Sequence, residues 1–183
     1  MEKLTLEHIA PYLPYGLMVI RISKCERTYI NPGPYKLIGA DNLNAGYLHG
    51  ASFSIENSKP ILRSMDLTKP ITIEGKEVIP IVELAKIMWG DKIEIGNFRK
   101  TDNYQVCEIN PNTMHVLRHL IFDSDGFHHS APRHREPVLN QIRTCPNQRE
   151  LWKWLYANKF DVDGLIDAGL AIDVNTLETN PYE

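Results

Sequence analysis

Residues 71–79 constrain the fold of this chain more than any other stretch of the sequence. They read ITIEGKEVI, with Glu74-Gly75 between two short runs of strand-forming residues. This pattern is typical of two antiparallel strands joined by a two-residue turn. A turn at Glu74-Gly75 places Ile71 opposite Val78, on the same face. The sequence therefore predicts a β-hairpin here, and antiparallel pairing as the main way in which strands meet.

A helix is predicted to follow directly, over residues 80–89. Pro80 suits the first turn of a helix, and Gly90 suits the position just after the last turn. Between them the apolar residues recur at helical spacing, which predicts one buried face: Ile81, Leu84, Ala85 and Met88.

Three further helices are predicted near the two ends of the sequence. Thr5 begins a short N-terminal helix that the following prolines end. Asn147, with a glutamate three residues later, begins a helix over residues 148–159. Asp161 is in position to begin a second C-terminal helix, over residues 162–168.

Other segments have the composition of strands, among them residues 17–22, 92–95 and 104–109. Residues 114–122 fit either a strand or a helix. We favour a strand, because a turn at residues 110–113 would fold this segment back onto the preceding strand.

The length and composition fit one globular domain. The chain has 183 residues, of which 43% are hydrophobic and 23% charged, close to ordinary globular values. Antiparallel hairpins combined with a few helices predict an α+β fold. We expect a single domain over residues 1–176 and a flexible tail over residues 177–183.

The charge is unevenly distributed along the chain. The formal net charge is -3, but residues 1–40 carry five basic and three acidic side chains, and residues 150–183 carry two and seven. No basic stripe is visible, so we do not expect non-specific binding to nucleic acid. A local patch of basic residues is left open.

The cysteines and the apolar runs bear on the compartment. The sequence has three cysteines, Cys25, Cys107 and Cys145, which are widely spaced. An odd number without close spacing is typical of free thiols in a reducing compartment. The N-terminus lacks the apolar core of a signal peptide, and residues 16–20 form a run far too short to span a bilayer. We expect a cytoplasmic protein that does not bind membranes.

Three stretches carry a resemblance to a known group of proteins. They are residues 4–17 (LTLEHIAPYLPYGL), residues 59–69 (KPILRSMDLTK) and residues 160–173 (FDVDGLIDAGLAID). Together they resemble small proteins of phages and prophages of gut bacteria, a group with no established activity. The resemblance implies a phage-linked protein in the host cytoplasm, and it carries over no functional residue.

Histidines are concentrated in one segment, where they form the candidate metal site. Five of the seven lie within residues 115–134, and two cysteines flank them. The candidate ligands are His115, His119, His128, His129, Cys107 and Cys145. Zinc is the metal that such ligands favour. His115 and His119 would lie about 6 Å apart on a helix but about 13 Å apart on a strand, so our preference for a strand weakens this site. We expect no bound cofactor, with zinc as the alternative.

Two weaker candidates could bind a ligand or a partner. Arg133, His134 and Arg135 form a cationic triplet suited to binding phosphate or carboxylate. The alternative is that the triplet lies in a solvated loop and binds nothing. Trp152 and Trp154 point about 200° apart on a helix, so one of them packs inward while the other reaches a second element of the fold or a partner. We assign Trp152 to a partner surface.

The sequence favours a non-enzymatic binding module over two alternatives. The module would act on a host protein or a small ligand, for example in blocking antiviral defence. The first alternative is a metal-dependent enzyme that uses the histidines of residues 115–134. The second is a component of virion assembly, which would form a homo-oligomer.

Overall fold

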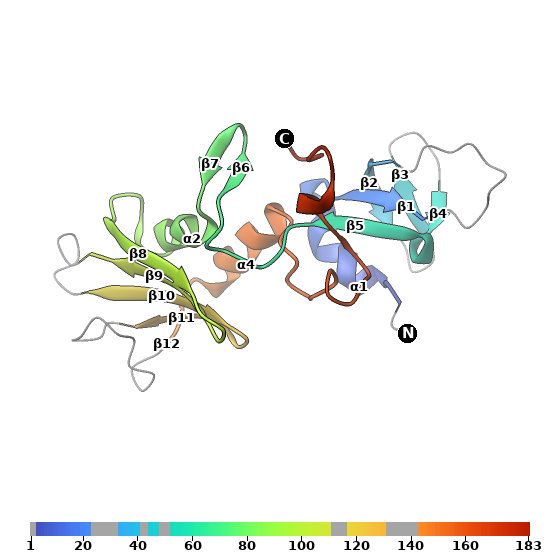
Figure 1. Cartoon of the computed structure of the whole chain (residues 1–183). Coiled ribbons are helices and arrows are strands. Elements are labelled where there is room, and N and C mark those ends of the chain that lie inside the picture. The colour runs from blue at the N-terminus through green and yellow to red at the C-terminus, as the bar shows by residue number, and fades with distance from the viewer. Residues whose placement is uncertain (1–2, 23–32, 41–43, 48–51, 111–116, 131–142) are drawn as a thin grey trace. The chain divides into compact units, whose positions relative to one another are not determined.

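The computed structural model describes residues 3–22, 33–40, 44–47, 52–110, 117–130 and 143–183. Contacts divide the chain into two compact units, whereas the sequence led us to expect one domain over residues 1–176. Unit 1 combines Met1–Met65 with Leu155–Glu183, and unit 2 is Asp66–Trp154. Both contain sheets and helical segments, which confirms the α+β class (Figure 1). Within the described residues, no helix is long and apolar enough to cross a membrane.

Unit 2 is built around a five-stranded antiparallel sheet. The strand order is β12-β11-β10-β9-β8. The strands are β8 (Ile95–Lys100), β9 (Gln105–Ile109), β10 (Arg118–Asp123), β11 (Gly126–Ser130) and β12 (Arg143–Thr144). Because β10 pairs antiparallel with β9, with Leu120 opposite Cys107, the preference for a strand in this region is confirmed over the described residues.

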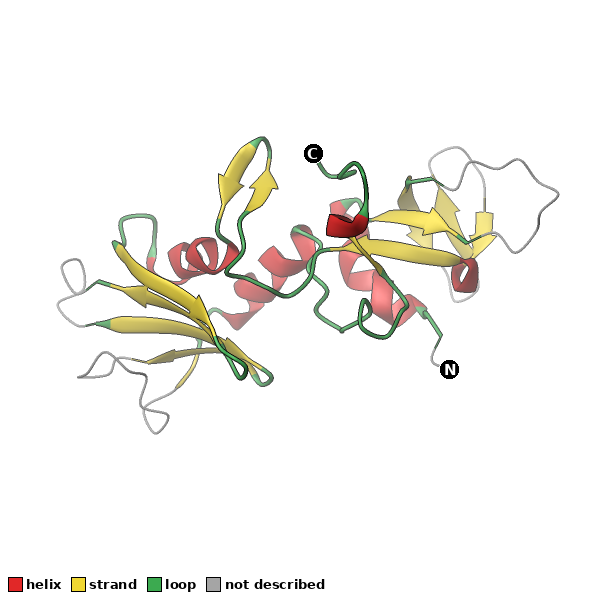
Figure 2. Cartoon of the chain, in the orientation of Figure 1, coloured by secondary structure: helices red, strands yellow, loops and turns green. Residues whose placement is uncertain are grey.

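The predicted hairpin and central helix are both confirmed in unit 2 (Figure 2). Strands β6 (Ile71–Ile73) and β7 (Lys76–Val78) pair with Ile71 opposite Val78. The two turn residues between them have left-handed φ values of 50° and 75°, as a tight hairpin turn requires. Helix α2 (Pro80–Trp89) ends where the Gly90 N–H donates to the Lys86 carbonyl at 2.6 Å.

Unit 1 contains a six-stranded sheet that joins segments from both ends of the sequence. The strand order is β13-β5-β1-β2-β3-β4. The strands are β1 (Met18–Arg21), β2 (Tyr35–Ala40), β3 (Asn44–Tyr47), β4 (Ser52–Ser54), β5 (Ser58–Leu62) and β13 (Ile172–Asp173). All neighbouring pairs are antiparallel except β13 and β5. The short helix α1 (Leu6–Ile9) follows Thr5, as predicted, and continues into a 3-10 helix, Ala10–Tyr15.

The two C-terminal helix predictions have different outcomes. Helix α4 (Gln148–Ala157) is present and ends two residues before the predicted boundary. The helix predicted over residues 162–168 is wrong, because this segment forms a series of turns. Gly164 adopts a left-handed φ of 70° within this segment, which an α-helix does not accommodate. The Asp161 carboxylate accepts hydrogen bonds from the Leu165 and Ile166 N–H groups, both at 2.8 Å, and so organises a turn without a helix.

The core of unit 1 depends on a buried tyrosine. Tyr12 is fully buried among apolar residues of the N-terminal segment and the sheet. Its hydroxyl donates to the Phe160 carbonyl at 2.7 Å and accepts from the Val162 N–H at 3.3 Å. Its ring packs edge-on against Tyr156, with centroids 5.0 Å apart. The Val162 N–H also donates to the Phe160 carbonyl at 2.9 Å, so the Tyr12 hydroxyl adds a hydrogen bond to each of two backbone groups that already pair with each other.

We predict that Tyr12→Phe lowers the free energy of unfolding by about 0.5–1.5 kcal/mol, because the hydrogen bond from the buried Tyr12 hydroxyl to the Phe160 carbonyl is lost. Urea unfolding followed by circular dichroism measures this change. Tyr15→Phe, at the half-buried end of the same 3-10 helix, is the matched control and should change stability less. Equal effects of the two substitutions would contradict the role given to the Tyr12 hydroxyl.

Candidate functional site

The sheet of unit 2 separates the histidines that the sequence grouped. Residues directly opposite each other on antiparallel strands share a face, and successive residues alternate between faces. His119 lies opposite Glu108 and Ser130. The next residue along β10 lies opposite Cys107 on β9 and His129 on β11, so those two side chains belong to the other face.

The predicted metal ligands are therefore not brought together in the described part of the chain. His128 lies opposite Ile121 and shares the face of His119, away from Cys107. Cys145 lies beyond β12, three strands from β9, which corresponds to about 14 Å at the usual strand spacing. Among the described residues, no three His, Cys, Asp or Glu side chains could hold one metal ion. His115 and His134 lie outside the described residues.

Glu108, His119 and Ser130 form a polar row across three strands. His119 Nδ1 lies 3.3 Å from Ser130 Oγ, and His119 Nε2 lies 4.0 Å from Glu108 Oε2. An acid, a histidine and a serine are also the residue types of a hydrolase triad. Ser130 and His119 are each only 1% exposed, however, so a substrate cannot reach the hydroxyl in this conformation. The row joins neighbouring strands by polar contacts instead.

The other two histidines of the sheet, His128 and His129, have different surroundings. His128 Nε2 lies 3.2 Å from Asp123 Oδ1 across the β10–β11 turn. Burial, assisted by the positive charges of Arg118 and Arg143, holds the pKa of His129 below its usual value. His129 is therefore neutral at pH 7.

Both described cysteines are buried and protonated. Cys107 is 0% exposed and Cys145 is 2% exposed. Burial raises the pKa of each thiol to about 12, with Glu108 adding to the effect at Cys107. Because the thiolate is the form that attacks electrophiles and binds metals, neither cysteine has that reactivity at neutral pH.

Trp152, which we assigned to a partner surface, lies in an aromatic cluster of unit 2. Its ring packs against Phe122 and Phe127, with centroids 6.0 and 5.1 Å apart. Its Nε1 donates to Gln148 Oε1 at 2.9 Å, and Gln148 Nε2 donates to the Phe127 carbonyl at 2.9 Å. These contacts hold the start of α4 to β10 and β11. Arg133, His134 and Arg135 lie outside the described residues.

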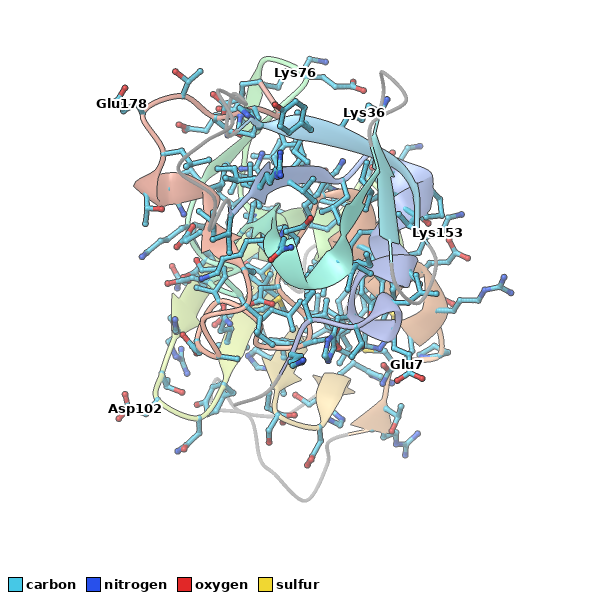
Figure 3. All side chains as sticks on the ribbon, turned by 90° about the vertical axis from the view of Figure 1, so that its right-hand side faces the viewer. Glu7, Lys36, Lys76, Asp102, Lys153 and Glu178 are labelled. Atoms are coloured by element: carbon cyan, nitrogen blue, oxygen red, sulfur yellow. The ribbon has the colours of Figure 1, made fainter. Side chains whose placement is uncertain are left out.

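Unit 1 carries a local group of basic residues, a possibility that the sequence analysis left open. Lys36 on β2 lies opposite Met18, and Lys59 on β5 lies opposite Ile20, so both lysines share one face of the sheet. Arg63 lies one residue beyond the end of β5, where it forms a parallel bridge with Phe160. Because it follows Lys59 by four residues, the alternation of side chains places both on the same face. The opposite face carries the apolar core, which includes Val19, Leu37 and Leu62. Figure 3 labels Lys36, whose side chain is exposed.

A fourth cation and an aromatic ring join this face from the C-terminal part of the chain. The Arg63 N–H donates to the Lys159 carbonyl at 2.7 Å, which places the two residues side by side. Lys159 Nζ lies 5.2 Å from the centroid of the Tyr182 ring, and the Arg63 guanidinium carbon lies 6.0 Å from it. We call Lys36, Lys59, Arg63 and Lys159 the basic face.

Three cations of the basic face, Lys36, Arg63 and Lys159, are close enough to affect one another. Burial, together with the positive charges of Arg63 and Lys36, lowers the pKa of Lys159. Burial also lowers the pKa of Arg63, and the negative charge of Glu183 opposes this effect. An anion bound here would relieve the repulsion among these groups, so the arrangement is suited to recognising phosphate or carboxylate.

A sequence signal for the basic face exists. Lys59 and Arg63 are four residues apart, a spacing that places both on one face of a strand. Lys159 and Tyr182 lie about a hundred residues further along the chain, and no local pattern connects them with this strand.

We predict that Cys107 and Cys145 react with iodoacetamide at least about 100-fold more slowly in the native protein than in concentrated urea, because both thiols are buried and protonated. Timed alkylation followed by peptide mass spectrometry gives the two rates separately. If either cysteine of the native protein is alkylated at the rate of an unfolded thiol, that thiol is not buried.

A functional assignment for this chain has to rest on the geometric observations above, because comparison with known proteins found no match. No protein-family model, no curated protein and no solved structure matches this chain.

Proposed function

We propose that this chain is a non-enzymatic binding module that recognises an anionic group of a host protein or small ligand through the basic face. The observation that carries the proposal is the placement of four cations from three separate segments on one face: the exposed Lys36, the half-buried Lys59 and Lys159, and Arg63, which is 6% exposed beneath the Tyr182 ring. Binding energy at such a surface comes from charge complementarity and from hydrogen bonds to oxygen atoms.

The described reactive groups of unit 2 support binding over catalysis. Ser130 and His119 are buried, and both described thiols are protonated at neutral pH. The basic face contains donors and a ring, which are groups for recognition. The resemblance to phage and prophage proteins supports a role in the host cytoplasm, with a factor of antiviral defence as one host protein that such a module would block.

We predict that the double variant Lys36→Glu/Lys59→Glu loses its partner. Reversing two charges at a recognition surface should reduce retention at least tenfold, which corresponds to about 1.4 kcal/mol. The measurement is affinity capture from host lysate for protein partners, with native mass spectrometry of the untagged protein for small ligands. A partner counts only if it is retained at a fixed stoichiometry.

The matched control is Lys76→Glu/Lys92→Glu, which makes the same charge change at two exposed lysines of unit 2. Lys76 is labelled in Figure 3. The control should retain whatever the wild type binds. Loss of the partner in both double variants would indicate a general charge effect, and loss in neither would rule out the basic face.

A further inference from the structure

The segment that follows β13 places one side chain where two strands of unit 1 separate. On β1 and β5, Val19 lies opposite Pro60, so Met18 and Ile61 are the next residues along. The Tyr182 hydroxyl accepts a hydrogen bond from the Met18 N–H at 3.0 Å and donates one to the Ile61 carbonyl at 2.7 Å. A single phenol thus bridges a donor and an acceptor of adjacent strands. Residues 177–183, which we expected to be a flexible tail, are held at this point.

The same ring interacts with two cations of the basic face. Lys159 Nζ and the Arg63 guanidinium lie 5.2 and 6.0 Å from its centroid. Cations at these distances from an aromatic ring are attracted by its quadrupole. The Tyr182 site therefore combines a hydrogen-bond donor, an acceptor and two positive charges around one phenol.

The charge of the segment is complementary to its surroundings. Residues 177–183 read LETNPYE and contain two glutamates and no basic residue. The basic face contributes four cations from the same unit. Glu183 favours the charged form of Arg63, which shows that the two charges interact. An acidic segment containing a tyrosine is thus the ligand chemistry that this surface already accommodates.

We propose that the basic face and the Tyr182 site form a recognition surface for acidic peptides that contain a tyrosine, and that residues 177–183 are its built-in occupant. This inference rests on the proposed binding function and names its ligand class. A partner segment of the same chemistry would take the place of Tyr182 in the hydrogen bonds to Met18 and Ile61. Its neighbouring carboxylates would meet Arg63 and Lys159.

An occupant in the same chain competes strongly with a free peptide. A short tether gives it an effective concentration on the order of 1 mM. A free peptide with an intrinsic dissociation constant of about 100 μM would therefore bind the intact protein about tenfold more weakly than a protein whose own tyrosine is missing. This difference provides the test.

The probe is a fluorescein-labelled synthetic peptide, LETNPYE, titrated by fluorescence anisotropy into the full-length wild type and into Tyr182→Ala. We predict that Tyr182→Ala binds this peptide about tenfold more tightly than the wild type. A second peptide has phenylalanine in place of the tyrosine and cannot make the two hydroxyl hydrogen bonds. It should bind Tyr182→Ala at least threefold more weakly. Equal affinities of the two proteins, or of the two peptides, would overturn the proposal.

Two variants in the Tyr182→Ala background test the role of charge. Lys159→Gln should weaken binding of the LETNPYE peptide, whereas Lys153→Gln, at an exposed position of α4, should leave it unchanged. If Tyr182→Ala is unfolded, the added peptide should restore the folded fraction measured by circular dichroism. Failure to restore it would overturn the proposal.

The outcomes separate this inference from the proposed function. A host partner that is lost in Lys36→Glu/Lys59→Glu, with no peptide binding by Tyr182→Ala, would leave the binding function standing and overturn the peptide class. Peptide binding with the predicted dependence on Tyr182 and Lys159 would support the inference, even where the lysate yields no partner that depends on the basic face.

Discussion

The alternation of side chains along β5 is the constraint on which unit 1 depends. Leu62 faces the apolar core, while Lys59 and Ile61 face the other side, where Arg63 follows. A shift of one residue in the pairing would turn Lys59 into the core and Leu62 out of it, at a cost of several kcal/mol. Packing of the core thereby fixes the positions of the cations, and the basic face is a consequence of how the sheet buries its other side.

In unit 2 the same alternation separates side chains, whereas in unit 1 it places them together. There it divides a cluster of histidines and cysteines between two faces, with His119 on one and Cys107 on the other. The polar groups that remain together, Glu108, His119 and Ser130, approach one another inside the sheet. Buried polar groups of this kind stabilise a structure when they satisfy each other, and they are shielded from any substrate.

Local patterns predicted the elements whose causes are local. The β6–β7 hairpin follows from Glu74-Gly75, and α2 follows from Pro80, its apolar face and Gly90. The helix expected over residues 162–168 failed because the left-handed conformation of Gly164 outweighs an amphipathic pattern seven residues long.

The candidate site was harder to predict because it is assembled from distant segments. Lys36, Lys59 and Lys159 become neighbours only through sheet order and through the bridge between Arg63 and Phe160. The surplus of positive charge in the first forty residues did not indicate this face, because Lys36 is the one member of the basic face that lies among them. The histidines, in contrast, looked like a site because they are close in sequence, and strand alternation separates such neighbours.

The discontinuity of unit 1 has a consequence for how the chain is synthesised. Unit 2 is one continuous segment, so all of its residues leave the ribosome together and it can fold at once. Unit 1 must wait for residues 155–183, which emerge after the 89 residues of unit 2. Synthesis reaches Glu183 only 118 residues after Met65, so at usual elongation rates this delay is about 6–24 s. During that interval the apolar face of β1 and β5 lacks Leu165 and Ala171 of the core, so part of it is open to chaperones in the cell that makes the protein.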